Sequence, residues 1–167
     1  MSMSTAAIPT WDDIARLLRL SRPVSGLSLR TLSLRDRALN GGVFEKCGLA
    51  GADFAGSDLA NACFIDCDMQ GVDLRAAALT NTTFVRCRMA DARMPIGVPA
   101  QLVLVDCALT GSDWQGTHLA RSAASGCDFA ASTMRGVRLE RSALWKAGLQ
   151  GVDMRDAVFD QAALCDT

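Results

Sequence analysis

The sequence predicts an all-β solenoid, a chain wound into stacked coils, because a five-residue repeat runs through most of it. The repeat frame begins at Leu29 and ends at Leu164, and 26 of its 28 positions hold Leu, Phe, Met or Trp. The exceptions are Pro99 and Ala124, and a small residue stands two positions before most of the large ones. A period of five fits neither a helix nor a strand and is typical of repeat proteins. We therefore expect the large and the small sites to face inward.

A second, longer period lies within the first. Cysteines recur at every twentieth position at the small inward site, and phenylalanines recur in the same way at the large site: Cys47, Cys67, Cys87, Cys107 and Cys127, and Phe44, Phe64 and Phe84. Four five-residue units therefore make one coil, and identical residues stack above one another. About seven such coils, spaced like neighbouring strands at roughly 4.8 Å, would give a rod on the order of 35 Å long.

The repeat units resemble those of pentapeptide-repeat proteins, whose pattern is A-(D/N)-L-x-x. This pattern occurs here as AGADFAGSDLANACF and as LQGVDMRDAVF, and the resemblance extends over residues 24–164. It implies a right-handed quadrilateral β-helix in which the large residues fill the core and the small residues lie beside them.

The N-terminal region lacks the repeat. We expect residues 1–9 to be disordered and residues 10–23 to contain a short helix, because Thr10 can cap its N-terminus and two aspartates follow at the positive end of its dipole. Its apolar face would cap the first coil of a β-helix spanning residues 24–167, since an open solenoid end exposes core and strand edge. A helix that docks onto a partner is the alternative.

Two prolines interrupt the repeat chemistry within residues 95–101, although the 20-residue spacing of the cysteines continues through this stretch. Proline cannot donate a backbone hydrogen bond to a neighbouring coil. We expect a local bulge or a short loop here, either protruding or as a distorted part of an intact coil.

The stretch LVLVDCALTGSDWQG is similar to the post-loop region of the quinolone-resistance pentapeptide proteins, which protect DNA gyrase by resembling duplex DNA. A column of aspartates includes Asp53, Asp73, Asp113 and Asp153, which could imitate phosphates. Arginines recur two residues along, however, and the net charge is only −1, whereas duplex DNA carries one charge per roughly 1.7 Å. Binding to gyrase or topoisomerase IV is therefore the alternative function, and no direct binding to nucleic acid is expected.

One outward face carries an apolar strip, which is the candidate partner-binding site. The strip includes Ile65, Val85, Val105 and Trp145. Exposed apolar patches often mark interaction sites, and Trp is frequent at binding hot spots. Alternatively, some of these side chains tuck against corners or under the helix. Beside the strip, a column alternates in charge, which we interpret as fold stabilisation because it avoids stacking like charges: Lys46, Asp66, Arg86, Asp106, Lys146 and Asp166.

The sequence offers no catalytic site, metal site or cofactor site. The inward cysteines form a straight column that does not converge on a metal as zinc requires, so we expect reduced thiols, with Cys63 and Cys165 facing outward. His118 is the single histidine and is expected to be an isolated surface residue. The chain has no run of 18 apolar residues and no signal-peptide pattern, so no membrane span and a bacterial, cytoplasmic location are expected.

These observations predict one non-enzymatic domain that serves as a protein–protein interaction module or scaffold. Its partner would be another protein of unknown identity, bound through the apolar strip or through the C-terminal end. That end needs a cover for its core, which an identical subunit across a two-fold axis could supply.

Overall fold

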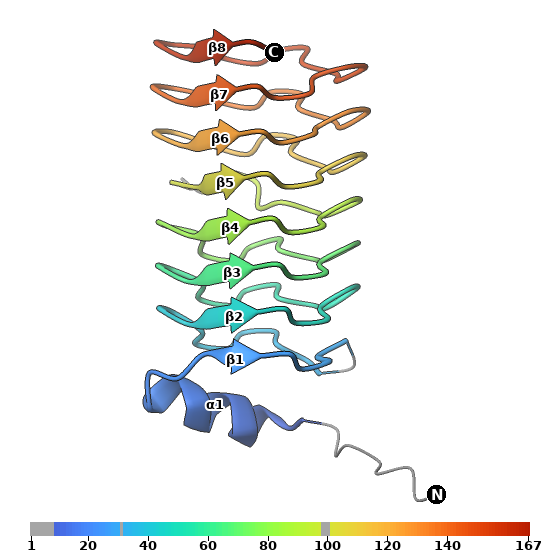
Figure 1. Ribbon diagram of the computed structural model, residues 1–167. Helices are drawn as coiled ribbons and strands as arrows, with labels where there is room; N and C mark the ends of the chain where they lie inside the picture. Colours follow the sequence, from blue (N-terminus) through green and yellow to red (C-terminus); the bar gives the residue numbers. More distant parts are fainter. Residues whose placement is uncertain (1–8, 31, 98–100) are drawn as a thin grey trace, which may run out of the picture.

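The computed structural model describes residues 9–30, 32–97 and 101–167 and shows a β-solenoid with one helix at its N-terminal end (Figure 1). Eight short parallel strands stack in sequence order into one sheet. Their bounds are β1 Val24–Ser25, β2 Val43–Glu45, β3 Cys63–Ile65, β4 Thr83–Val85, β5 Val103–Val105, β6 Ala123–Ser125, β7 Ala143–Trp145 and β8 Ala163–Cys165. The predicted all-β solenoid of about 7 turns is confirmed.

Each residue in the strands pairs with the residue one coil length further along the chain, and this offset is constant. Phe44 pairs with Phe64 within the sheet, and Phe64 pairs with Phe84. Single parallel bridges with the same shift occur on the three other sides of the coils, at pairs such as Gly48–Asp68, Asp53–Asp73 and Asp58–Ala78. Each coil therefore has four sides, one formed by a strand and three joined by single bridges, as the quadrilateral prediction requires.

The large side chains of the five-residue frame fill the core. Those that the structure describes from Leu29 to Leu144 are each at most 5% exposed. The rings of Phe44 and Phe64 stack with centroids 4.8 Å apart, and those of Phe64 and Phe84 stack at 5.1 Å. These separations match the spacing of neighbouring strands, so the coil-to-coil repeat of Phe becomes a continuous aromatic stack.

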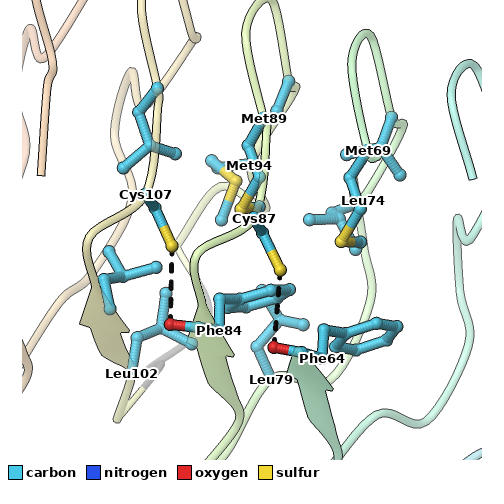
Figure 2. Close-up of a cluster of buried hydrophobic side chains, with 14 of the residues drawn as sticks. Phe64, Met69, Leu74, Leu79, Phe84, Cys87, Met89, Met94, Leu102 and Cys107 are labelled. Carbon is cyan, nitrogen blue, oxygen red and sulfur yellow. Dashed lines mark hydrogen bonds between the residues drawn. The ribbon is translucent and has the colours of Figure 1, made fainter. Parts of the chain in front are cut away.

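The column of five inward cysteines lies beside this stack. All five are buried free thiols, which agrees with the predicted reduced column. Figure 2 shows the Sγ–H groups of Cys87 and Cys107 donating to the carbonyl oxygens of Phe64 and Phe84, each at 3.4 Å. Neighbouring thiols and burial raise the pKa of Cys87, so this thiol stays protonated and unreactive in the folded chain.

The helix α1 (Trp11–Arg19) covers the N-terminal end of the coil stack (Figure 1). The Thr10 hydroxyl accepts from the Asp13 backbone N–H, and the Asp13 carboxylate accepts from the Thr10 N–H, which forms a capping box. Ile14 is fully buried, and the Arg37 guanidinium lies 4.6 Å from the centroid of the Trp11 ring. The helix packs against the end of the solenoid and contacts β1, as a cap would.

Two of the sequence expectations concern segments outside the described residues. Residues 1–8 and 98–100 lie there, and with them most of the expected N-terminal disorder and the centre of the expected bulge or loop at residues 95–101. The coils on either side keep their register, because Thr83 still pairs with Val103 and Val85 with Val105.

Candidate interaction surface

The outer side of the parallel sheet is the candidate interaction surface, and we call it the sheet face. In each strand from β2 to β7 the middle residue is buried and the two flanking residues point outward. With the matching residues of β8, the sheet face comprises Val43, Glu45, Cys63, Ile65, Thr83, Val85, Val103, Val105, Ala123, Ser125, Ala143, Trp145, Ala163 and Cys165. Glu45 is the only charged residue among them.

The four predicted contact residues lie in one ladder of the sheet face. Ile65 pairs with Val85 and Val85 with Val105, and Ser125 separates Val105 from Trp145. The first three are half-buried by their neighbours, whereas the Trp145 side chain is 54% exposed. Since α1 contacts the end strand β1, the ladder does not lie under the helix.

The sequence interpretation did not recognise a low part of this surface. Ser125 lies between the bulkier Val105 and Trp145 in one ladder, and the small Ala123 and Ala143 follow Val103 in the other. Ala123 and Ala143 lie one and two coil lengths after Val103 in the sequence. The repeat that predicts the apolar strip therefore also predicts this row of small residues. The sheet face is therefore bulky over β3 to β5 and low over β6, with an indole ring rising from β7.

Two contacts hold the indole ring of Trp145 in place. Its Nε1–H donates to the Asp166 carboxylate in the next coil at 3.2 Å, and the Lys146 ammonium lies 5.6 Å from the ring centroid. A side chain that is fixed before binding loses less conformational entropy when a partner covers it.

The charges that follow the strands form a column along one edge of the sheet face, which we call the corner column. It contains Lys46, Asp66, Arg86, Asp106, Gly126, Lys146 and Asp166, and each of them has a positive φ. Arg86 donates to both carboxylate oxygens of Asp66, at 2.7 and 3.0 Å, and this hydrogen bonding lowers the pKa of Asp66. Asp66 and Arg86 thus form a charged pair beside an almost uncharged face.

The aspartate column on another side of the solenoid is largely neutralised by arginine. Arg75 contacts Asp73 and Arg155 contacts Asp153, both with 2.6 Å between nitrogen and oxygen. The hydrogen bond from Arg155 lowers the pKa of Asp153 to about 2. A similar pair joins Arg35 and Asp53 at 3.0 Å. This side consequently lacks the unbroken negative charge of a duplex.

The environment of His118 differs from the expected one. This residue is half-buried, and its Nε2 lies 3.0 Å from a carboxylate oxygen of Glu140, whose other oxygen accepts from Arg138 Nε at 2.6 Å. The expectation of an isolated surface histidine is therefore wrong. The next coil supplies the Glu140 carboxylate two residues after Arg138, which is the residue stacked on His118. Over the described ranges, no group of three or more His, Cys, Asp or Glu residues is placed to hold a metal ion.

Two further surfaces adjoin the sheet face. A hollow of about 490 Å³ separates the end of α1 from β2 and is lined by Leu18, Arg22, Val43 and Glu45, among others. At the opposite end of the solenoid, the last coil leaves Phe159 37% and Leu164 44% exposed. Within the part of the chain that the structure describes, no helix has the length and apolar character needed to cross a membrane.

Comparisons with known proteins identify the repeat. The model of the family described as pentapeptide repeats matches in 8 copies over residues 39–75, 67–94 and 103–141, which together make up more than half of the chain. No curated protein sequence matches.

Solved structures with the same kind of repeat include three distant ones. A trypsin-treated QnrB1, a plasmid-mediated fluoroquinolone resistance protein, is 19% identical, with 86% of this chain and 72% of that chain covered and a TM-score of 0.49. HetL of the cyanobacterium Nostoc sp. strain PCC 7120, involved in heterocyst differentiation regulation, is 17% identical over 93% and 94%, with a TM-score of 0.27. A pentapeptide repeat protein of the Arabidopsis thaliana thylakoid lumen is 20% identical over 56% and 65%, with a TM-score of 0.29.

The matched repeats, the four-sided coils and the inward frame of large residues agree with one another. The chain belongs to the pentapeptide-repeat family, and its fold is the right-handed quadrilateral β-helix of that family.

Proposed function

We propose that this chain is a non-enzymatic interaction module that binds another protein through the sheet face, with Ile65, Val85, Val105 and Trp145 as contact residues. The main support is that the outer face of the parallel sheet is almost uncharged and that no described residue covers it. Parallel sheets normally have both faces covered, and their strands are apolar throughout instead of alternating. The strands Cys63–Ile65 and Val103–Val105 have this composition. Pentapeptide-repeat proteins are generally structural or interaction modules, which agrees with this role.

Trp145 is the residue on which the proposal depends most. A Trp side chain buries roughly 150–250 Å², so covering the exposed half would remove on the order of 100 Å² from water and contribute about 2–3 kcal/mol. The neighbouring Ala123, Ser125 and Ala143 leave room beside the ring, so a large apolar side chain of the partner can pack against it. A partner with a protruding apolar residue is therefore favoured over a flat polar one.

A capture experiment with matched variants tests this proposal. Wild-type protein, Trp145→Glu and Gln115→Glu are each used to retain proteins from a lysate of the native host. Gln115 is exposed and lies outside the sheet face, so its substitution adds the same charge elsewhere. We expect a partner that wild type and Gln115→Glu retain and Trp145→Glu loses. A partner that Trp145→Glu retains as well would refute the assignment of the surface.

The alternative function is binding to DNA gyrase or topoisomerase IV by imitating DNA, as in an antibiotic-resistance protein. The stacked aspartates support it, but arginines neutralise Asp53, Asp73 and Asp153. Recovery of gyrase or topoisomerase IV subunits that the Trp145→Glu variant still retains would favour this alternative over the sheet face.

Two further parts of the proposal concern assembly and location. The exposed Phe159 and Leu164 would be covered if two copies met through their last coils, so a homodimer through this end is part of the proposal. The five buried thiols suit a reducing compartment, and this supports placing the protein in the cytoplasm.

A further inference from the structure

We propose that two copies of this chain associate through their sheet faces, with antiparallel solenoid axes and with β5 of one copy on β5 of the other. The two-fold axis lies between the faces and runs parallel to the strands. This homodimer differs from the one through the last coils. It also goes beyond binding of another protein, with which it would compete for the same surface.

The sheet faces of two copies have the same repeat spacing. Both copies present strands at the same spacing, so ridges and hollows keep their register along the whole face. A helix, whose turns repeat every ~5.4 Å, loses register with strands spaced about 4.8 Å apart. The face also carries almost no charge, with Glu45 as the exception, so two copies do not repel each other there.

Side-chain size along the sheet face also favours this arrangement. With β5 at the centre, β4 opposes β6 and β2 opposes β8 of the second copy. Val85 then lies over Ser125, Thr83 lies over Ala123, and Val103 meets its own counterpart. The bulky β4 of each face thus covers the small β6 of the other, while β3 opposes β7 and the exposed Trp145 ring meets Ile65 of the second copy. The two-fold axis repeats both contacts, as in any isologous interface.

The corner column supports this arrangement most strongly. The same two-fold axis places Lys46 opposite Asp166 of the second copy and Asp66 opposite Lys146 of the second copy. Symmetry repeats both pairs, so four contacts of opposite charge flank the interface. Arg86 faces Gly126, and only Asp106 meets its own copy at the axis. The corner column of one copy is therefore complementary in charge to the corner column of the other copy, which runs in the opposite direction across the two-fold axis at β5.

Three other two-fold arrangements of the sheet faces pair the charges less well or bury less area. A two-fold axis along the solenoid would place the corner column against the opposite edge, where Lys146 would meet Arg141 and Asp66 would meet Asn61. A dimer centred on β4 would bring Arg86 to Arg86 and Asp66 to Asp106. A dimer centred on β6 also pairs opposite charges, but it leaves β2 and β3 uncovered.

The size of the face predicts weak, reversible association. On this side, each coil contributes five residues at about 3.3 Å each, and seven coils are spaced about 4.8 Å apart. The face therefore measures roughly 16 by 34 Å, and the dimer buries about 1,100 Å² in total. This is at the low end for specific interfaces and typical of transient ones. The dimer fraction should therefore rise with protein concentration in sedimentation equilibrium.

The sequence provides an unusually direct test, because its two lysines, Lys46 and Lys146, both lie in the corner column. A zero-length carbodiimide joins a lysine to a carboxylate that it contacts, and peptide mass spectrometry identifies the pair. We expect links from Lys46 to Asp166 and from Lys146 to Asp66. Within one copy these pairs are separated by six and four coils, about 29 and 19 Å, so such links form only between copies.

Charge reversal and a face variant complete the test. Lys146→Asp should lower the dimer association constant at least tenfold, and the double variant Asp66→Lys/Lys146→Asp should restore it. Val103→Asp should abolish association, whereas the control Gln115→Asp should leave it unchanged. A monomer at every concentration, links confined to neighbouring coils, or a double variant without recovery would overturn the proposal. A dimer that survives Val103→Asp and is lost in Phe159→Asp would overturn it in favour of contact through the last coils.

Discussion

Phe64→Ala is the substitution that tests the core of this solenoid most severely. The Phe64 ring is fully buried, and it stacks on Phe44 at 4.8 Å and on Phe84 at 5.1 Å. A third ring, that of Phe54, meets it edge-on with centroids 6.0 Å apart. The substitution therefore removes the central ring of a stack and leaves a cavity between coils that are tied to one another by backbone hydrogen bonds.

The expected loss follows from these contacts. Phe→Ala substitutions in packed cores cost about 3–5 kcal/mol, and stacked aromatic pairs contribute roughly 0.5–1.5 kcal/mol each beyond burial. Since two stacked pairs disappear and the paired strands on both sides limit collapse of the cavity, we expect a loss of about 5 kcal/mol in the free energy of unfolding.

Phe159→Ala is the matched control, because Phe159 occupies the same five-residue frame in the last coil and is 37% exposed. It should cost about 1 kcal/mol or less, as partly exposed residues away from a packed core do. Urea unfolding followed by circular dichroism and by Trp fluorescence measures both variants. A Phe64→Ala loss below about 2 kcal/mol, or one no larger than that of the control, would refute the continuous aromatic stack.

Three further predictions concern the Thr117 hydroxyl, the Asp153 carboxylate and the cysteines. Thr117→Val should raise the free energy of unfolding by about 1 kcal/mol, because none of the described residues forms a hydrogen bond with the buried Thr117 hydroxyl and Val137 fills the equivalent site one coil later. A lower melting temperature would contradict this. The pKa of Asp153 is lowered from 3.8 to about 2, so its contribution to stability is complete above pH 4 and is lost as the pH falls toward 2. The Asp153→Asn variant should therefore lose less stability than wild type over this pH range, which unfolding measured at stepwise pH would show. In native protein a maleimide should modify the exposed Cys165 first and spare the five buried cysteines, whereas mass spectra showing equal modification of all seven would disprove their burial.

Much of the fold could be predicted because the repeat removes most conformational choices. Once the length of one coil is known, each residue has a fixed stacked neighbour, so the ladder through Ile65, Val85 and Val105 follows from arithmetic. The buried cysteine column and the capping role of Thr10 follow from equally local signals. The repeat thus predicts which residues share a side of the solenoid and which point inward.

Other features depend on side-chain reach, which the repeat does not encode. The contact of His118 with Glu140 joins positions that are not stacked on each other, because a long side chain crosses from one column to the next. The exposed fraction of Ile65 depends on the size of its neighbours, and the fixed orientation of Trp145 depends on Asp166 in the following coil. The value of the corner column for self-association likewise becomes visible only when a second copy is placed against it.

The measurement that most directly tests the central claim, that the sheet face is a binding surface, is the capture experiment with wild type, Trp145→Glu and Gln115→Glu. We expect a protein partner that wild type and Gln115→Glu retain equally and that Trp145→Glu loses. Equal retention by all three proteins, or loss only with Gln115→Glu, would contradict the claim and move the binding surface to another side of the solenoid.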